Sequence, residues 1–274
     1  MLSVNTNYGA MVALQNLNAT QSMLAQTENR ISTGLAVGGP KDNGAVWAVA
    51  QGMRADVASL ASVTTSLNNA TSATDVAVSA GQSISDLLTQ MKAKALAASD
   101  SSLDANSRAA YNADFVALRD QIKSIVSNAS FNGVNLIDGS TASLQALANA
   151  KGDAFITVTA RDLSLGGSNV SVAATNTIST AANASAMITT VDNSINAVDL
   201  ALAQLGTDSK KVSIQQTFVS SLSDSLTQGI GNLVNADMAK ESANLTALQT
   251  KQQLGIQALS IANQAPAAIL SLFR

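Results

Sequence analysis

The sequence predicts a mainly α protein built from long, antiparallel, coiled-coil-like helices with a small β-hairpin region. Hydrophobic residues make up 46% of the 274 residues and aromatic residues only 3%, so the apolar content consists of small and branched aliphatic side chains, which suit closely packed helices. Only two prolines occur, so helices can run far without interruption. Apolar residues also recur at intervals of three and four along most of the chain.

The first segment predicts an amphipathic helix with a coiled-coil type of seam. Its apolar residues recur at intervals of three, four and seven, at positions Ala10, Leu14, Leu17, Leu24 and Ile31. Arg30 followed by Gly34 fits the end of that helix. Gly38, Gly39 and Pro40 form a break, and either Asp42 or Asn43 is suited to cap a second helix.

That second helix is predicted to be about 55 residues long, or roughly 80 Å at 1.5 Å per residue. Its apolar stripe runs from Val46 to Leu67 and, after a phase slip, resumes at Ala77, Ile84, Leu87 and Met91. A third stripe follows Asp104, at positions Tyr111, Phe115, Leu118, Ile122 and Ile125.

The β-hairpin region is predicted at about 131–180. Asn132-Gly133 and Asp138-Gly139 are turn signals. Phe155 to Ser179 alternates apolar and polar residues and is rich in Thr and Val, which is typical of short strands, with Gly166-Gly167 as the expected hairpin turn.

Helical spacing returns at Met187 and continues to Leu233, which predicts a long fourth helix. A final seam contains Met238, Leu245, Leu248, Leu259, Ala262, Ile269 and Phe273, and it is widened by Leu254, Ile256 and Ile261. The chain therefore begins and ends in amphipathic helices. Two such helices can cover only part of each other, so either they contact neighbouring subunits or they belong to an ordinary intramolecular bundle.

Composition argues against several function classes. The chain has no His and no Cys, so it lacks the usual metal ligands and thiol nucleophiles, and no enzyme activity, metal or cofactor is expected. A net charge of −3 with scattered Lys and Arg argues against nucleic acid as a binding partner.

No run approaches 18 consecutive apolar residues, so no membrane insertion is expected. The start also lacks a basic, apolar signal peptide, which alone would favour the cytoplasm.

Three motifs stand out, one near each end of the chain and one in the centre. The first is Arg30-Ile31-Ser32-Thr33-Gly34-Leu35 followed by Lys41-Asp42-Asn43. The second is Phe131-Asn132-Gly133-Val134. The most specific runs from Ala236-Asp237-Met238-Ala239 through Ala262-Asn263-Gln264 to Ile269-Leu270-Ser271-Leu272-Phe273-Arg274. These motifs resemble those of bacterial flagellin, in particular the short flagellins of alphaproteobacteria, and the resemblance covers roughly residues 1–140 and 185–274.

The resemblance implies a subunit that self-assembles into the flagellar filament for swimming motility, as a helical homopolymer or with other flagellins. It implies secretion through the flagellar export apparatus with a chaperone, contact with the filament cap and hook-associated proteins, and an extracellular location. Residues 1–40 with 235–274 would form the terminal coiled-coil domain of an inner tube, and 41–234 a rod domain. In a stretch that a host receptor recognises in other flagellins, Gln90, Ala93 and Lys94 replace Arg, Glu and Leu.

The candidate polymerisation interface consists of the terminal seams, with Arg30, Leu14, Leu17, Leu24 and Ile31 from one end and Leu245, Leu248, Leu259, Ile269 and Phe273 from the other. Asn132 and Gly133 form a candidate hairpin that helps the subunit switch between packings, or merely a tight turn. The same seams could serve only an intrachain core.

Three other readings rank lower. A hook-filament junction protein shares flagellin-like termini, but the contiguous match at the C-terminal end argues against it. A lipid-coating protein would place Lys and Arg along its polar faces, whereas these faces carry Ser, Thr, Asn and Gln. A protease insert would need His-Glu-x-x-His, and the chain has no His.

Overall fold

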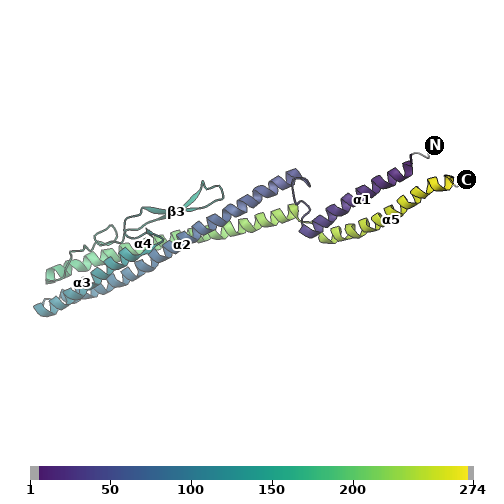
Figure 1. Ribbon diagram of the computed structural model, residues 1–274. Helices are drawn as coiled ribbons and strands as arrows, with labels where there is room; N and C mark the ends of the chain where they lie inside the picture. Colours follow the sequence, from purple (N-terminus) through teal and green to yellow (C-terminus); the bar gives the residue numbers. More distant parts are fainter. Residues whose placement is uncertain (1–5, 271–274) are drawn as a thin grey trace. The chain divides into compact units, whose positions relative to one another are not determined.

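The computed structural model describes residues 6–270, and its elements confirm a mainly α fold with long helices and a small hairpin region (Figure 1). The helices within that range are α1 Tyr8–Thr33, α2 Gly44–Ala98, α3 Ala105–Asn128, α4 Ala181–Val234 and α5 Met238–Leu270. The strands are β1 Ser130–Phe131, β2 Val134–Asn135, β3 Ser143–Leu147 and β4 Phe155–Thr159.

These elements divide into two compact units. The terminal unit combines the first residues, up to Ala55, with those from Ser225 onward, and the central unit is Asp56–Asp224. The divisions between the units fall inside α2 and α4, because both helices continue across them. The predicted inner-tube and rod domains, divided near residues 40 and 235, remain a prediction about the polymer.

In the terminal unit, α1 and α5 pack antiparallel. The Asn7 Nδ2 donates to the Ala262 carbonyl oxygen at 2.7 Å near the start of α1. In the middle of α1, the Leu17 Cδ1 lies 3.3 Å from where a Cβ on Gly255 would stand. At the end of α1, Arg30 pairs with Glu241. Small residues on α5 therefore allow a close approach of the two helices.

The ends of these helices follow the predicted capping chemistry. Gly34 follows α1 with a φ of 71°, and its N–H donates to the Arg30 carbonyl oxygen at 2.8 Å. Asn43 caps α2, because its Oδ1 accepts the Val46 N–H at 3.2 Å. Asp42 instead accepts the N–H groups of Gly38 and Gly39. The two residues that the sequence left as alternatives thus have separate tasks.

The two connections of the terminal unit are also hydrogen-bonded to each other. The Ala36 N–H donates to the Val234 carbonyl oxygen at 2.7 Å, and the Ala236 N–H donates to the Gly34 carbonyl oxygen at 2.9 Å. Asp237 then caps α5 through the backbone N–H groups of Ala239 and Lys240. The chain therefore leaves α1 and enters α5 at one bridged point.

In the central unit, α2 and α4 pack antiparallel over a heptad core. Lys92 pairs with Asp192 at 2.6 Å, and the Ser85 hydroxyl donates to Asp199 at 3.1 Å. Every seventh residue of α4 is buried in a run from Val191 to Val219. The core is completed by buried residues of α2 and α3, among them Leu60, Leu67, Ile84, Leu88, Met91, Phe115, Ile122 and Val126.

The buried stripe of α2 is continuous, so the predicted phase slip is wrong. Val63, Ala70 and Thr74 fill the interval that seemed to lack apolar residues. Thr74 tolerates full burial because its hydroxyl donates to the Ala70 carbonyl oxygen at 2.7 Å. Further along, Leu88 rather than Leu87 is fully buried. The sequence analysis missed this continuity because small and hydroxyl residues occupy some of the buried positions.

The helix α3 begins at a well-formed cap. The Asp104 carboxylate accepts the N–H groups of Asn106 and Ser107 and the Ser107 hydroxyl at 2.6 Å. These hydrogen bonds, the one from the Ser107 hydroxyl first, hold the pKa of Asp104 below its usual value. Lys94 of α2 donates to Asp114 of α3 at 2.7 Å, and that bond raises the pKa of Lys94.

The β region consists of two separate hairpins. β1 pairs with β2 across Asn132 and Gly133, whose φ values of 49° and 80° fit a two-residue hairpin turn. β3 pairs with β4, with Ser143 opposite Thr159 and Leu147 opposite Phe155. The second hairpin is held to the helices because Leu147 donates its N–H to Ser66 of α2 and Thr159 to Asp208 of α4.

The prediction of strands over residues 155–179 around Gly166-Gly167 is correct only at its start. The hairpin pairs β4 with β3, whose sequence had no strand signal. Beyond Thr159, the Gly166-Gly167 turn joins an isolated bridge between Leu165 and Val170 rather than two strands. Local side-chain bonds replace a ladder there: the Ser164 N–H bonds the Asp162 carboxylate, and the Asn169 amide bonds the Asp162 carbonyl oxygen.

Candidate assembly surface on the terminal helices

Most of the predicted interface residues lie along the seam between α1 and α5. Leu17 is only 8% exposed and faces Gly255. The other seam leucines and isoleucine are half-buried, namely Leu24, Ile31, Leu245, Leu248 and Leu259. The side chain of Ile269 and all of Phe273 lie outside the described residues. Pairing within the chain thus covers much of the predicted seam.

A second set of apolar side chains on the same helices remains uncovered. On α1, Tyr8 is 80% exposed, Met11 64%, Met23 54% and Leu14 48%. On α5, Ile261 is 70% exposed, and Leu254 and Ile256 are also exposed. We refer to these residues together as the outward apolar set.

Three members of the outward apolar set lie around the side of α1 that faces away from Leu17. At about 100° per residue, Met11 and Met23 lie about 120° to either side of Leu17, and Tyr8 lies opposite it. A helix with one buried seam and apolar side chains on both flanks is suited to contact neighbours on both sides. Of this set, the sequence analysis assigned only Leu14 to the interface. It noted the three residues of α5 only as widening the final seam, and it passed over Tyr8, Met11 and Met23.

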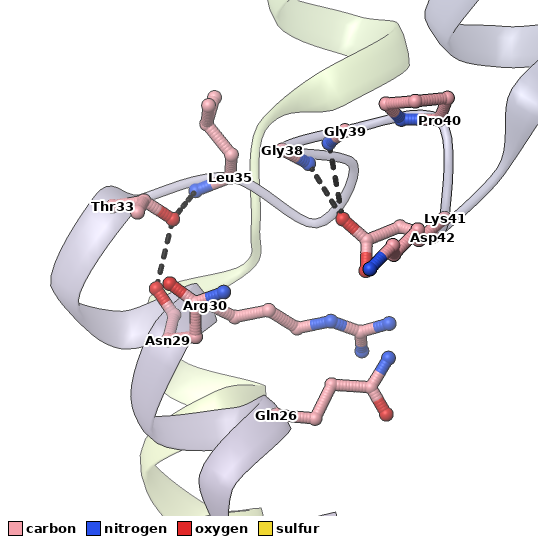
Figure 2. Close-up of a pocket in the computed structure, with 10 residues that line it drawn as sticks. All are labelled: Gln26, Asn29, Arg30, Thr33, Leu35, Gly38, Gly39, Pro40, Lys41 and Asp42. Atoms are coloured by element: carbon pink, nitrogen blue, oxygen red, sulfur yellow. Dashed lines mark hydrogen bonds between the residues drawn. The ribbon is translucent and has the colours of Figure 1, made fainter.

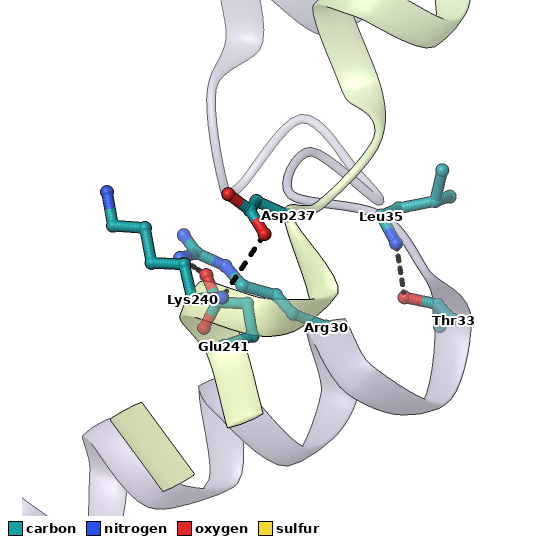
Figure 3. Close-up of polar contacts among 6 residues, drawn as sticks. All are labelled: Arg30, Thr33, Leu35, Asp237, Lys240 and Glu241. Atoms are coloured by element: carbon teal, nitrogen blue, oxygen red, sulfur yellow. Dashed lines mark hydrogen bonds and ion pairs between the residues drawn. The ribbon is translucent and has the colours of Figure 1, made fainter. Parts of the chain in front are cut away.

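Arg30 and Glu241 connect the C-terminal end of α1 to the first turn of α5 (Figure 3). The Arg30 Nη1 lies 3.2 Å from the Glu241 Oε1, and the Glu241 side chain is only 9% exposed. Two further atoms, the Arg30 Nε and the Glu241 Oε2, are buried and have no hydrogen-bond partner. The ion pair thus joins the end of α1 to the start of α5, although its two unpartnered atoms leave it incompletely hydrogen-bonded.

A cavity of about 440 Å³ lies between the end of α1 and the turn that follows it (Figure 2). Arg30 and Gln26 line it from α1, and Pro40, Lys41 and Asp42 line it from the turn. The Asp42 Oδ2 is occupied by the backbone N–H groups of Gly38 and Gly39. The carboxylate therefore serves to shape the turn.

Family models match both ends of the chain. The model of the bacterial flagellin N-terminal helical region matches residues 4–142, and that of the C-terminal helical region matches residues 188–273. The chain belongs to the bacterial flagellin family. Together the two regions contain all of the terminal helices that are described above and much of the central unit.

Individual flagellins are similar over their whole length. Flagellin FljM of Caulobacter vibrioides is 54% identical over 272 residues, which is 99% of this chain and 98% of that protein. The flagellin of Brucella melitensis biotype 1 is 36% identical over 287 residues, with all of both chains covered. The hook-filament junction reading is not better supported than the flagellin one.

A solved structure described as a flagellar hook-associated protein from Vibrio parahaemolyticus has a TM-score of 0.55 to this chain and is 14% identical. The match covers 71% of this chain and 100% of that one. At that identity, the similarity concerns the fold alone.

The remaining candidate residues and site types are placed as follows. Asn132 and Gly133 form an exposed turn in the central unit. Among residues 6–270, no group of three or more carboxylates, His or Cys is clustered as a metal site would require. Over the same range, no helix has both the length and the apolar character needed to cross a bilayer.

Proposed function

We propose that this chain is a structural, non-enzymatic subunit of the bacterial flagellar filament and that it polymerises through its paired terminal helices. Family membership supports the filament role. The outward apolar set supports the mechanism, because apolar side chains on both flanks of α1 remain in water after α1 and α5 have paired.

The predicted interface residues have two roles in this proposal. The seam residues, among them Leu17, Leu24 and Leu248, hold α1 against α5. Each subunit therefore presents a stiff two-helix unit. Leu14 and the rest of the outward apolar set then contact unlike surfaces of neighbouring copies. Repeated contacts between unlike surfaces extend into an open helical array when the rotation does not close a ring.

Family resemblance also supports a wider setting for the subunit. Residues 1–40 and 235–274 would form the inner tube, and 41–234 the surrounding rod layer. Export through the flagellar apparatus with a chaperone, addition beneath the cap and extracellular residence follow from the same resemblance. The turn at Asn132 and Gly133 is proposed to help the subunit change between packings.

Seeded elongation tests the polymerisation mechanism. Purified protein is added to sheared filament fragments, and growth is measured by electron microscopy for the wild type, Met11→Glu and Ile261→Glu. Both positions are exposed, so a carboxylate there leaves the subunit folded, whereas burial of that charge between copies is costly. We expect elongation to fall at least about tenfold in each variant.

The matched control is Leu96→Glu, because Leu96 is exposed to a similar extent but lies in the central unit. Versions lacking residues 1–35 or 236–274 should not elongate at all. Equal growth of the wild type, the two charged variants and the truncations would refute polymerisation through the terminal helices.

A further inference from the structure

The chain has a distinctive distribution of oxidisable sulfur. It contains seven methionines and no cysteine, so every sulfur atom is a thioether. Met11 and Met23 of α1 are mostly exposed, and Met238 at the start of α5 is 43% exposed. In the central unit, Met91 is fully buried and Met187 is nearly so. Among the methionines of residues 6–270, the three most exposed thus lie on the terminal helices, while Met53 of α2 is half-buried.

We propose that Met11 and Met23 form an oxidation site on the free subunit and that their conversion to sulfoxides blocks assembly. This inference rests on the proposed function, because the two residues lie on opposite flanks of α1 within the outward apolar set. The reactant is a peroxide, such as hydrogen peroxide. Access of the oxidant decides which methionines react, because susceptibility follows exposure.

The reaction is a transfer of one oxygen atom. A lone pair of the methionine sulfur attacks one peroxide oxygen, the O–O bond breaks and an S–O bond forms. The sulfur is oxidised by two electrons, and the second peroxide oxygen leaves as water after it takes up a proton. The product side chain is a polar sulfoxide in place of a flexible apolar thioether.

The sulfoxide is tolerated in the free subunit and rejected at a contact between copies. In the free subunit its oxygen is exposed to water and hydrated, because both side chains lie on the outside of α1. In the polymer the same oxygen has to lose its water, and an apolar partner offers no hydrogen bond in return. Oxidation at two sites on opposite flanks of α1 impairs contacts on both sides.

The test treats monomeric protein with hydrogen peroxide, removes the peroxide with catalase, and measures both peptide masses and seeded elongation. We expect sulfoxides at Met11 and Met23, unmodified Met91 and Met187, and elongation reduced at least about tenfold. Treatment with methionine sulfoxide reductases of both stereospecificities should restore growth.

Leucine variants identify the responsible sulfur atoms. Met11→Leu with Met23→Leu keeps apolar side chains of similar volume at both contacts but leaves no sulfur to oxidise, so peroxide should not lower the elongation of this double variant below its own untreated rate. The control Met238→Leu removes an exposed thioether from α5, and it should stay as sensitive as the wild type. Sensitivity that persists in the double variant, or disappears in the control, would overturn the assignment.

Two outcomes separate this inference from the proposed function. If Met11 and Met23 are fully oxidised and growth is unchanged, the oxidation site is refuted while assembly through the terminal helices stands. If untreated Met11→Glu protein grows as the wild type does, the proposed mechanism itself fails.

In preformed filaments, both methionines should resist the peroxide concentration that oxidises them in the monomer.

Discussion

Replacing Leu17 with alanine separates the intrachain seam from the outward apolar set. Leu17 is 8% exposed, so the substitution removes about three buried carbon groups, at roughly 0.8 kcal/mol for each. The seam can partly close over the gap because it borders solvent, so the expected loss of α1–α5 pairing is about 2 kcal/mol. Leu14 on the same helix is 48% exposed, and Leu14→Ala should cost about 1 kcal/mol or less.

Hydrogen–deuterium exchange of α1 peptides measures this pairing directly in the monomer. A loss of about 2 kcal/mol corresponds to roughly 30-fold faster exchange through local opening, and 1 kcal/mol to roughly fivefold. In seeded elongation, Leu14→Ala should lower the growth rate more than Leu17→Ala does, because it removes a contact between copies while leaving α1 paired with α5. Unchanged exchange in Leu17→Ala would refute the α1–α5 pairing, and normal elongation of Leu14→Ala would remove Leu14 from the interface.

Three further predictions concern the ion pair, the helix packing and a helix cap. Arg30→Gln should weaken α1–α5 pairing by about 2 kcal/mol because it leaves the Glu241 carboxylate buried without a cation, and Glu241→Gln in addition should recover part of that loss. Exchange of α1 in a double-mutant cycle measures this, and a double variant no better than Arg30→Gln would contradict it. Gly206→Ala meets open space, whereas the Cβ of Gly81→Ala would stand 2.6 Å from a leucine Cδ2 of α4. Both gain helix propensity, so urea unfolding should show Gly81→Ala less stable than Gly206→Ala by about 1–2 kcal/mol, and equal stabilities would exclude tight packing at Gly81. The lowered pKa of Asp104 means that its stabilisation is complete above the unfolded-state pKa of about 3.9 and is lost as pH falls through the lower folded-state value. Asp104→Asn keeps the cap acceptor, so the part of the acid transition of α3 that is due to this group, followed by circular dichroism, should disappear; an identical transition in the variant would exclude that role.

Residues that act through the local backbone were predictable from the sequence. Gly34 follows α1 because glycine adopts a positive φ without steric cost, and Asn132-Gly133 forms a hairpin turn for the same reason. The extent of α2 followed from helical spacing between a cap and the Asp100–Asp104 region, although the sequence analysis placed a phase slip within it. These features depend on neighbours along the chain, so the order of the residues contains the necessary information.

Other features of the fold depend on contacts with residues that are distant in the sequence. The strand β3 pairs with β4, which follows it closely along the chain, but its sequence has no strand signal, and Leu147 at its end donates to Ser66 of α2, which is 81 residues away. Asp208 is buried because it accepts a strand N–H.

The terminal helices show both parts of this division. Sequence by itself determined that α1 and α5 are amphipathic helices and, through the motifs at both ends, to which family the chain belongs. Periodicity alone does not tell which apolar residues face the partner helix when several flanks of a helix are apolar. Only the tertiary structure separated Leu17 in the seam from Met11 and Met23 on the flanks, because burial depends on where α5 packs.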